Sequence, residues 1–242
     1  MPAVQDNTSA ESILTEVGAR TLALAAEVAG WGPDEVAAPS ALPGWSRGHV
    51  LAHVAGHADA VRAVLVRAAA GESSSMYPSA QARNAAIEAG ATAPPQVLLR
   101  RLLESADALA SAWRALPEAG LGVRFTAPAG WWREVREIPW LRWREVALHH
   151  VDLGTGRAAP PGGPLGSRLV AETLSGFAER SDVPALDVTD TDSGASRRIG
   201  PAGPRAVAVE GDSGALALWL TGRSGGAGLA PSEGLPVLPA WL

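Results

Sequence analysis

Apolar side chains recur at helical spacing in several long segments of the chain. The first segment, residues 11–29, keeps its apolar positions on one face, and Ser9 or Thr8 precedes it as a candidate N-cap. The second runs from residue 46 to 70, and Ser46 stands at its start after a loop rich in Pro and Gly. Each pattern predicts an amphipathic helix with one buried face.

Two further helices of this kind are predicted downstream. One follows the Pro94-Pro95 pair and ends before Pro117, and the other begins at Pro139, which is tolerated in a first helical turn. Residues 79–90 predict a shorter helix, and residues 118–138 predict an irregular segment. Four long helices favour an antiparallel four-helix bundle. The apolar face of the third long helix is predicted to hold Leu99, Leu102, Leu103, Ala106, Leu109, Trp113 and Leu116.

The pattern changes in the last third of the chain. Residues 154–166 are dense in Gly and Pro, which is typical of a linker. A helix near 167–180 is followed by the short strand-like pieces LDVTD, ASRRIG and RAVAVEG, and then by the helical ALALWLTGR. The fold class expected is therefore α plus α+β: a bundle over residues 1–157 and a small α+β domain over residues 158–242.

Composition narrows the function only a little. The chain has 242 residues, 47% of them hydrophobic, and a net charge of −5, which argues against nucleic acid as a partner. All of its 20 basic residues are arginines, and it contains no cysteine. It lacks a signal-peptide pattern and any apolar run of membrane-spanning length, so we expect a cytoplasmic protein with no membrane partner.

Three residues carry the most specific chemical signal. Glu145 and His149 are spaced i, i+4, so both side chains lie on one face of the fourth helix. His53 falls within the apolar stripe of the second helix and is expected to point inward. Two imidazoles and one carboxylate form the His₂Glu ligand set of a catalytic zinc site, with the fourth position left open. A buried histidine bonded to a buried glutamate without metal is the simpler alternative.

Other polar residues near these three give a less specific chemical signal. His49 and His57 lie one turn to either side of His53 and are expected to be pocket or core residues. His150 faces away from the other ligands and is expected to be structural. Asp152 either orients an imidazole or helps to end the helix.

Longer motifs add a family resemblance. PGWSRGHVLAHVAGHADAV, RWREVALHHVDLG and LWLTGR together resemble the mycothiol-dependent maleylpyruvate isomerase family over nearly the whole chain. The resemblance implies a DinB-like bundle, a sterol-carrier-like C-terminal domain, and zinc ligands at His53, Glu145 and His149. It also implies that Arg223 of LTGR is catalytic.

The same resemblance implies that mycothiol binds the zinc through sulfur and supplies the nucleophile, in keeping with a chain that has no cysteine. We interpret the reaction as reversible thiolate addition to the cis double bond of maleylpyruvate, rotation, and loss of the thiol to give fumarylpyruvate, a step in gentisate degradation. Arg223 would hold a carboxylate or the enolate. A dicarboxylate entering an acidic protein needs local arginines, for which Arg83 and Arg144 are the further candidates.

Several alternatives stay open. A mycothiol S-transferase, or another zinc-thiol enzyme, would use the same ligands on a different electrophile. A non-enzymatic module that binds a small molecule is a more distant possibility. Other divalent metals suit the same ligands. The chain is expected to be a monomer.

Overall fold

The computed structural model describes residues 9–127, 130–202 and 205–241 and divides into two compact units between Ala158 and Ala159. The first unit begins with helix α1 (Ala10–Val28), whose N-cap is Ser9: the Ser9 hydroxyl oxygen accepts a hydrogen bond from the Ser12 amide at 3.1 Å. Thr8, the other candidate cap, lies outside the described residues.

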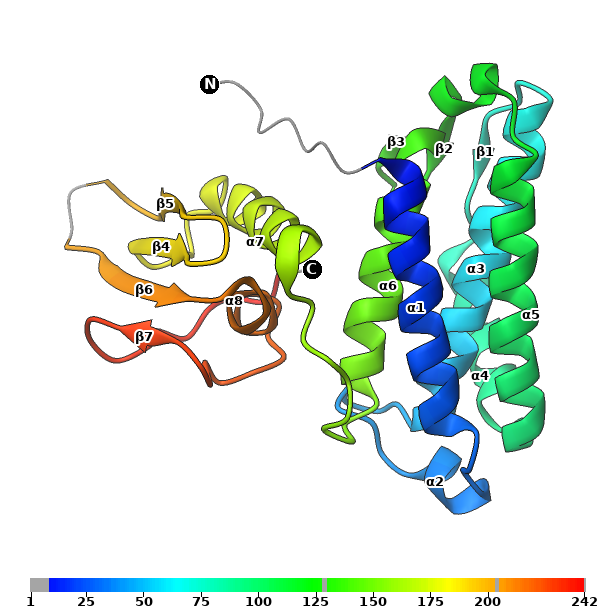
Figure 1. The fold of residues 1–242 in the computed structure, drawn as a ribbon, viewed down its shortest axis with the longest axis horizontal. Helices are drawn as coiled ribbons and strands as arrows, with labels where there is room; N and C mark the ends of the chain where they lie inside the picture. The colour runs from blue at the N-terminus through cyan, green and yellow to red at the C-terminus, as the bar shows by residue number, and fades with distance from the viewer. Residues whose placement is uncertain (1–8, 128–129, 203–204, 242) are drawn as a thin grey trace. The chain divides into compact units, whose positions relative to one another are not determined.

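Long helices run side by side in the first unit, as Figure 1 shows. Helix α1 packs against α5 (Pro95–Arg114) and α6 (Ile138–Asp152), and α3 (Arg47–Ala69) packs against the same two helices. The four helices therefore enclose one core, as the apolar periodicity predicted. Leu24 of α1 is completely buried there, a contribution of about 1.5–3 kcal/mol relative to an exposed side chain.

The buried face of α5 differs from the prediction by a small rotation. Leu102 and Leu109 are buried as expected, but Leu98 is buried in place of Leu99, which is only partly covered, as is Leu103. The helix begins at Pro95, so its first turn presents Leu98 to the core. Leucine occurs at 98, 99, 102 and 103, and the apolar pattern alone does not choose between two adjacent stripes.

Short elements join the long helices. The predicted loop before Ser46 contains a one-turn helix, α2 (Pro33–Ala37), and α4 (Ala80–Ala91) occupies the predicted short helix. Residues 118–138 are more regular than expected. They hold the 3₁₀ helices η1 (Glu118–Gly122) and η2 (Val135–Glu137) and the strands β2 (Arg124–Thr126) and β3 (Trp132–Glu134). With β1 (Ser74–Ser75), these strands make a three-stranded sheet in which β2 is central.

The second unit is a small α+β fold. Helix α7 (Gly163–Ala178) starts inside the predicted linker, because Pro164 is accommodated in its first turn. Strands β4 (Leu186–Asp190), β5 (Ala195–Ile199), β6 (Val207–Gly211) and β7 (Ala230–Pro231) form a sheet in the order β5-β4-β6-β7. Strands β4 and β6 are parallel, and the other two pairs are antiparallel. Helix α8 (Ser213–Leu220) packs on α7.

The predicted fold class, a helical bundle followed by a small α+β unit, is confirmed. Among the described residues, no helix combines the length and apolar character that crossing a bilayer requires.

Candidate metal centre

Helix α3 places His53 inside the first unit. Its N-cap, Ser46, accepts from the His49 amide, and the His49 ring nitrogen Nδ1 accepts from the Ser46 amide at 3.1 Å, which closes a capping box. Gly48, the second residue of α3, lets the helix pack closely against the backbone of Ala91, because an added Cβ would overlap the Ala91 carbonyl oxygen. His53 lies one and a half turns further on and is only 4% exposed. Its ring packs against Trp45 in a T-shaped arrangement, with the ring centres 5.6 Å apart.

Helix α6 supplies the carboxylate and the second imidazole. Pro139 stands in its first turn, where the missing amide hydrogen costs no helical hydrogen bond. Glu145 and His149 follow one turn apart, and His149 Nε2 lies 3.2 Å from Glu145 Oε2. The i, i+4 spacing therefore brings the two side chains together as predicted.

The three predicted ligands converge across α3 and α6. His53 Nε2 lies 3.1 Å from the same Glu145 oxygen, Oε2, and the His53 and His149 ring centres are 4.6 Å apart. One ligand atom from each residue lies within 4.8 Å of the others. Two imidazole nitrogens and a carboxylate oxygen at this spacing fit the donor set of a divalent cation such as Zn²⁺, which binds such atoms at about 2.0–2.2 Å.

Charges are strongly coupled in this cluster. Burial opposes the ionisation of Glu145, but His57, His149 and His53 together hold its pKa well below the ordinary value. Burial lowers the pKa of His53 in spite of its hydrogen bond with Glu145. The pKa of His149 moves the other way, to about 9: burial lowers it, but Asp152 and Glu145 outweigh that effect. The cluster thus holds an ionised carboxylate beside a protonated imidazole.

Asp152 fixes the orientation of His149. Its Oδ2 lies 2.8 Å from His149 Nδ1, and the carboxylate is almost completely buried. A proton on Nδ1 donates to this carboxylate, which leaves Nε2 facing Glu145. The backbone oxygen of Asp152 accepts from the Ala41 amide, so the residue also anchors the end of α6. Of the two roles considered for Asp152, the structure supports both.

Three further side chains lie beside the cluster, and their contacts there were not predicted from the sequence. His57 Nε2 lies 3.6 Å from Glu145 Oε1, and the completely buried Arg142 donates from Nη1 to the Val54 carbonyl at 2.7 Å. Tyr77 is hydrogen-bonded to Arg83, and burial together with Glu145 raises the pKa of Tyr77 to about 12. The i+4 spacing from His53 was the available signal for His57. Nothing in the pattern singled out Arg142 or Tyr77.

The candidate arginines lie in different surroundings. Arg83 Nη2 is 3.5 Å from His53 Nδ1, which places this guanidinium at the edge of the cluster. The Arg144 guanidinium is 6.0 Å from the ring centre of Trp140. Arg223, in the second unit, donates from Nη1 to the Thr221 carbonyl at 3.1 Å, just beyond the end of α8. The functional roles of all three stay predictions.

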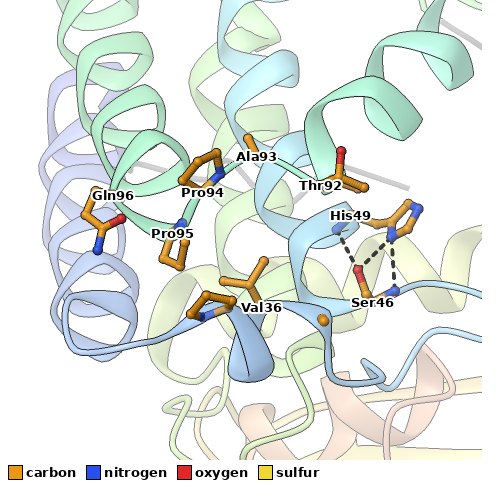
Figure 2. Close-up of a pocket in the computed structure, with 11 residues that line it drawn as sticks. Val36, Ser46, His49, Thr92, Ala93, Pro94, Pro95 and Gln96 are labelled. Atoms are coloured by element: carbon orange, nitrogen blue, oxygen red, sulfur yellow. Dashed lines mark hydrogen bonds between the residues drawn. The ribbon is translucent and has the colours of Figure 1, made fainter.

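The remaining histidines have structural partners. His150 Nε2 is 2.8 Å from Glu27 Oε2 of α1, so this side chain ties two helices together, as expected for a structural residue. His49 contacts Ser46 and Glu88 and lines a pocket, shown in Figure 2, whose walls are largely apolar. The pocket lies between α2, the start of α3 and the α4–α5 turn, and its lining includes none of the three cluster residues. We therefore assign the candidate chemistry to the partly buried cluster of His53, Glu145 and His149 rather than to this pocket.

Comparison with known proteins gives a consistent result. A family model described as "Mycothiol maleylpyruvate isomerase N-terminal domain" matches residues 17–154. The crystal structure of the mycothiol-dependent maleylpyruvate isomerase is 29% identical with a TM-score of 0.87, and both chains are covered completely. A histidine-to-alanine mutant of a mycothiol-dependent maleylpyruvate isomerase gives 28% identity and a TM-score of 0.86, again over both full chains. A comparison with curated proteins finds no match.

The family match covers more than half of the chain and includes His53, Glu145 and His149. The full-length structural matches extend the likeness through the second unit. The chain therefore belongs to the mycothiol maleylpyruvate isomerase N-terminal domain family.

Proposed function

We propose that this chain is a mycothiol-dependent maleylpyruvate isomerase that holds a divalent metal, Zn²⁺ by preference, through His53, Glu145 and His149. Its substrate is the dicarboxylate maleylpyruvate and its product is fumarylpyruvate. The family match and the full-length likeness to a solved isomerase of that name support the reaction. The observation that carries the proposal is the convergence of three ligand-type side chains from two helices, α3 and α6.

The donor set accounts for the metal. A bound zinc ion would act as a Lewis acid that favours the thiolate of mycothiol over the thiol at neutral pH. Glu145 contributes negative charge, because its pKa is well below the ordinary value, and Asp152 orients His149. The chain has no cysteine of its own, so the reactive sulfur comes from the small thiol.

The three candidate arginines would bind the anionic substrate or the thiol. Arg83 lies 3.5 Å from His53, at the edge of the cluster, and would attract an anionic ligand to the site. We assign Arg223 to a substrate carboxylate or to the enolate oxygen, for which the planar guanidinium offers two parallel donors. Arg144 is a third candidate for binding the thiol or the substrate.

Under this proposal, residues 1–157 form the metal-binding domain and residues 158–242 form a sterol-carrier-like domain. The protein works as a cytoplasmic monomer in gentisate degradation. It needs only small molecules as partners.

Purified protein supplied with zinc and mycothiol tests the reaction. If the chain is an isomerase, the absorbance of maleylpyruvate should decrease as fumarylpyruvate forms, and the concentration of thiol should stay constant. Glu145→Ala should abolish turnover. Glu104→Ala, which removes an exposed carboxylate on α5, should leave turnover unchanged. Stoichiometric loss of thiol would instead identify an S-transferase, and absence of any thiol-dependent reaction would contradict the proposal.

A further inference from the structure

The two oxygens of Glu145 face different partners. Oε2 lies 3.1 Å from His53 Nε2 and 3.2 Å from His149 Nε2. Oε1 lies 3.6 Å from Nε2 of His57, which comes one turn after His53 on α3. One oxygen therefore faces the proposed metal ligands and the other faces a buried imidazole behind them.

Arg142 lies next to this arrangement on α6, three residues before Glu145. Its guanidinium is completely buried, and Nη1 donates at 2.7 Å to the carbonyl of Val54, the residue that follows His53. This hydrogen bond joins α6 to α3 beside a ligand from each helix. The charge of Glu145 is the strongest influence that favours the protonated guanidinium against burial.

Ordinary packing does not account for these two side chains. Among the described residues, Arg142 Nε and Nη2 and His57 Nδ1 are buried with no hydrogen-bond partner. Burying such groups is costly, and apolar side chains of similar volume at a helix interface usually give equal or greater stability. Their position behind Glu145 gives a reason for their presence that stability alone does not.

We propose that His57 and Arg142 are positioning residues for the metal centre. His57 packs against Oε1 of Glu145 at 3.6 Å and limits its movement, and Arg142 fixes α6 against α3 beside His53, so that Oε2 stays aimed at the two imidazoles. The inference rests on the proposed metal site, and it gives the two Glu145 oxygens different neighbours: the ligand imidazoles beside Oε2 and His57 beside Oε1. Loss of the His57 ring would leave space beside Oε1 into which the carboxylate could rotate.

Metal affinity of His57 variants tests this role directly. Competition with a chromophoric chelator should show that His57→Leu weakens zinc binding by about 10- to 100-fold, the usual effect of removing a residue that orients a metal ligand. His57→Gln keeps an N–H donor on a side chain of similar length facing Oε1 and should weaken zinc binding much less than His57→Leu does. The Co²⁺-substituted protein should show a changed d–d absorption spectrum in the Leu variant, because the carboxylate binds differently.

Matched variants separate positioning from folding. His49→Leu removes another histidine of α3, whose ring contacts Ser46 and Glu88, and should leave zinc affinity unchanged. His57→Asn keeps an amide but is too short to reach Glu145, so it should weaken binding even if the Leu variant does not fold. Arg142→Met should weaken binding for a different reason, through movement of α6 relative to α3.

The outcomes distinguish this inference from the proposed function. If wild-type protein binds no divalent metal, the proposed function fails and this inference fails with it. If the wild type binds zinc, and folded His57→Leu or His57→Asn binds it equally well with an unchanged cobalt spectrum, the positioning role is overturned while the metal site stands.

Discussion

Zinc affinity should fall as the pH is lowered below about 9, because the metal must displace a proton from His149. In the metal-free protein the pKa of His149 is raised to about 9: burial lowers it, but Asp152 and Glu145 raise it by more. A ligand imidazole must be neutral, so protons and metal compete for Nε2. Each pH unit below the pKa weakens binding tenfold. At pH 7, two units below, the competition costs about 2.7 kcal/mol, or roughly 100-fold in affinity.

Asp152→Asn changes this profile in two ways. Loss of the carboxylate 2.8 Å from the ring lowers the pKa of His149. Zinc affinity should therefore stop rising at a lower pH than in the wild type. The limiting affinity at high pH should also weaken by about 10- to 100-fold, because the imidazole ring loses the partner that orients it. Asp107→Asn makes the same chemical change at an exposed position on α5 and should leave the profile unchanged.

Two assays measure the effect. Chelator competition between pH 6 and 9.5, with the chelator calibrated at each pH, gives the slope of log Kd against pH. Calorimetry at pH 7 in buffers of different ionisation enthalpy counts the protons released, and about one per metal is expected. A zinc affinity that stays constant from pH 7 to 9, with no proton released, would refute the assignment of His149 as a protonated ligand.

Three further predictions concern other parts of the structure. His150→Leu leaves the buried Glu27 carboxylate without its partner at 2.8 Å, so the free energy of unfolding in urea should fall by about 3 kcal/mol; a fall below about 1 kcal/mol would mean that the pair contributes little. Gly48→Ala forces a Cβ against the Ala91 carbonyl and should destabilise the protein by about 1–3 kcal/mol in the same assay, and an unchanged midpoint would contradict the close packing. Arg223→Ala should lower kcat by about 100-fold at unchanged zinc affinity. Weaker zinc binding in this variant would show that Arg223 supports the metal site rather than the substrate.

The sequence predicts the long helices and the three clustered residues well, for physical reasons that are local. Apolar periodicity depends on the 3.6-residue turn, and the i, i+4 spacing of Glu145 and His149 fixes their common face whatever surrounds them. The placement of His53 needed one further condition, an inward face on α3, which its position in the apolar stripe supplied. The structure brings the three side chains together.

The side chains that surround the cluster could not be predicted from the sequence in the same way. The contact of His57 with Glu145 depends on how α3 and α6 are rotated and aligned against each other, which periodicity does not specify. A buried arginine such as Arg142 looks, in sequence, like any charged residue of an amphipathic helix. Strands of two or three residues, as in β1 and β2, are too short for an alternating pattern to appear.

X-ray absorption at the zinc edge of the purified protein would show whether His53, Glu145 and His149 bind the metal together. We expect one zinc per chain, bound by two imidazole nitrogens and a carboxylate oxygen at about 2.0–2.2 Å, with the imidazole signal reduced in His53→Ala. Protein that binds no zinc, or zinc whose spectrum is unchanged in His53→Ala, would contradict this expectation.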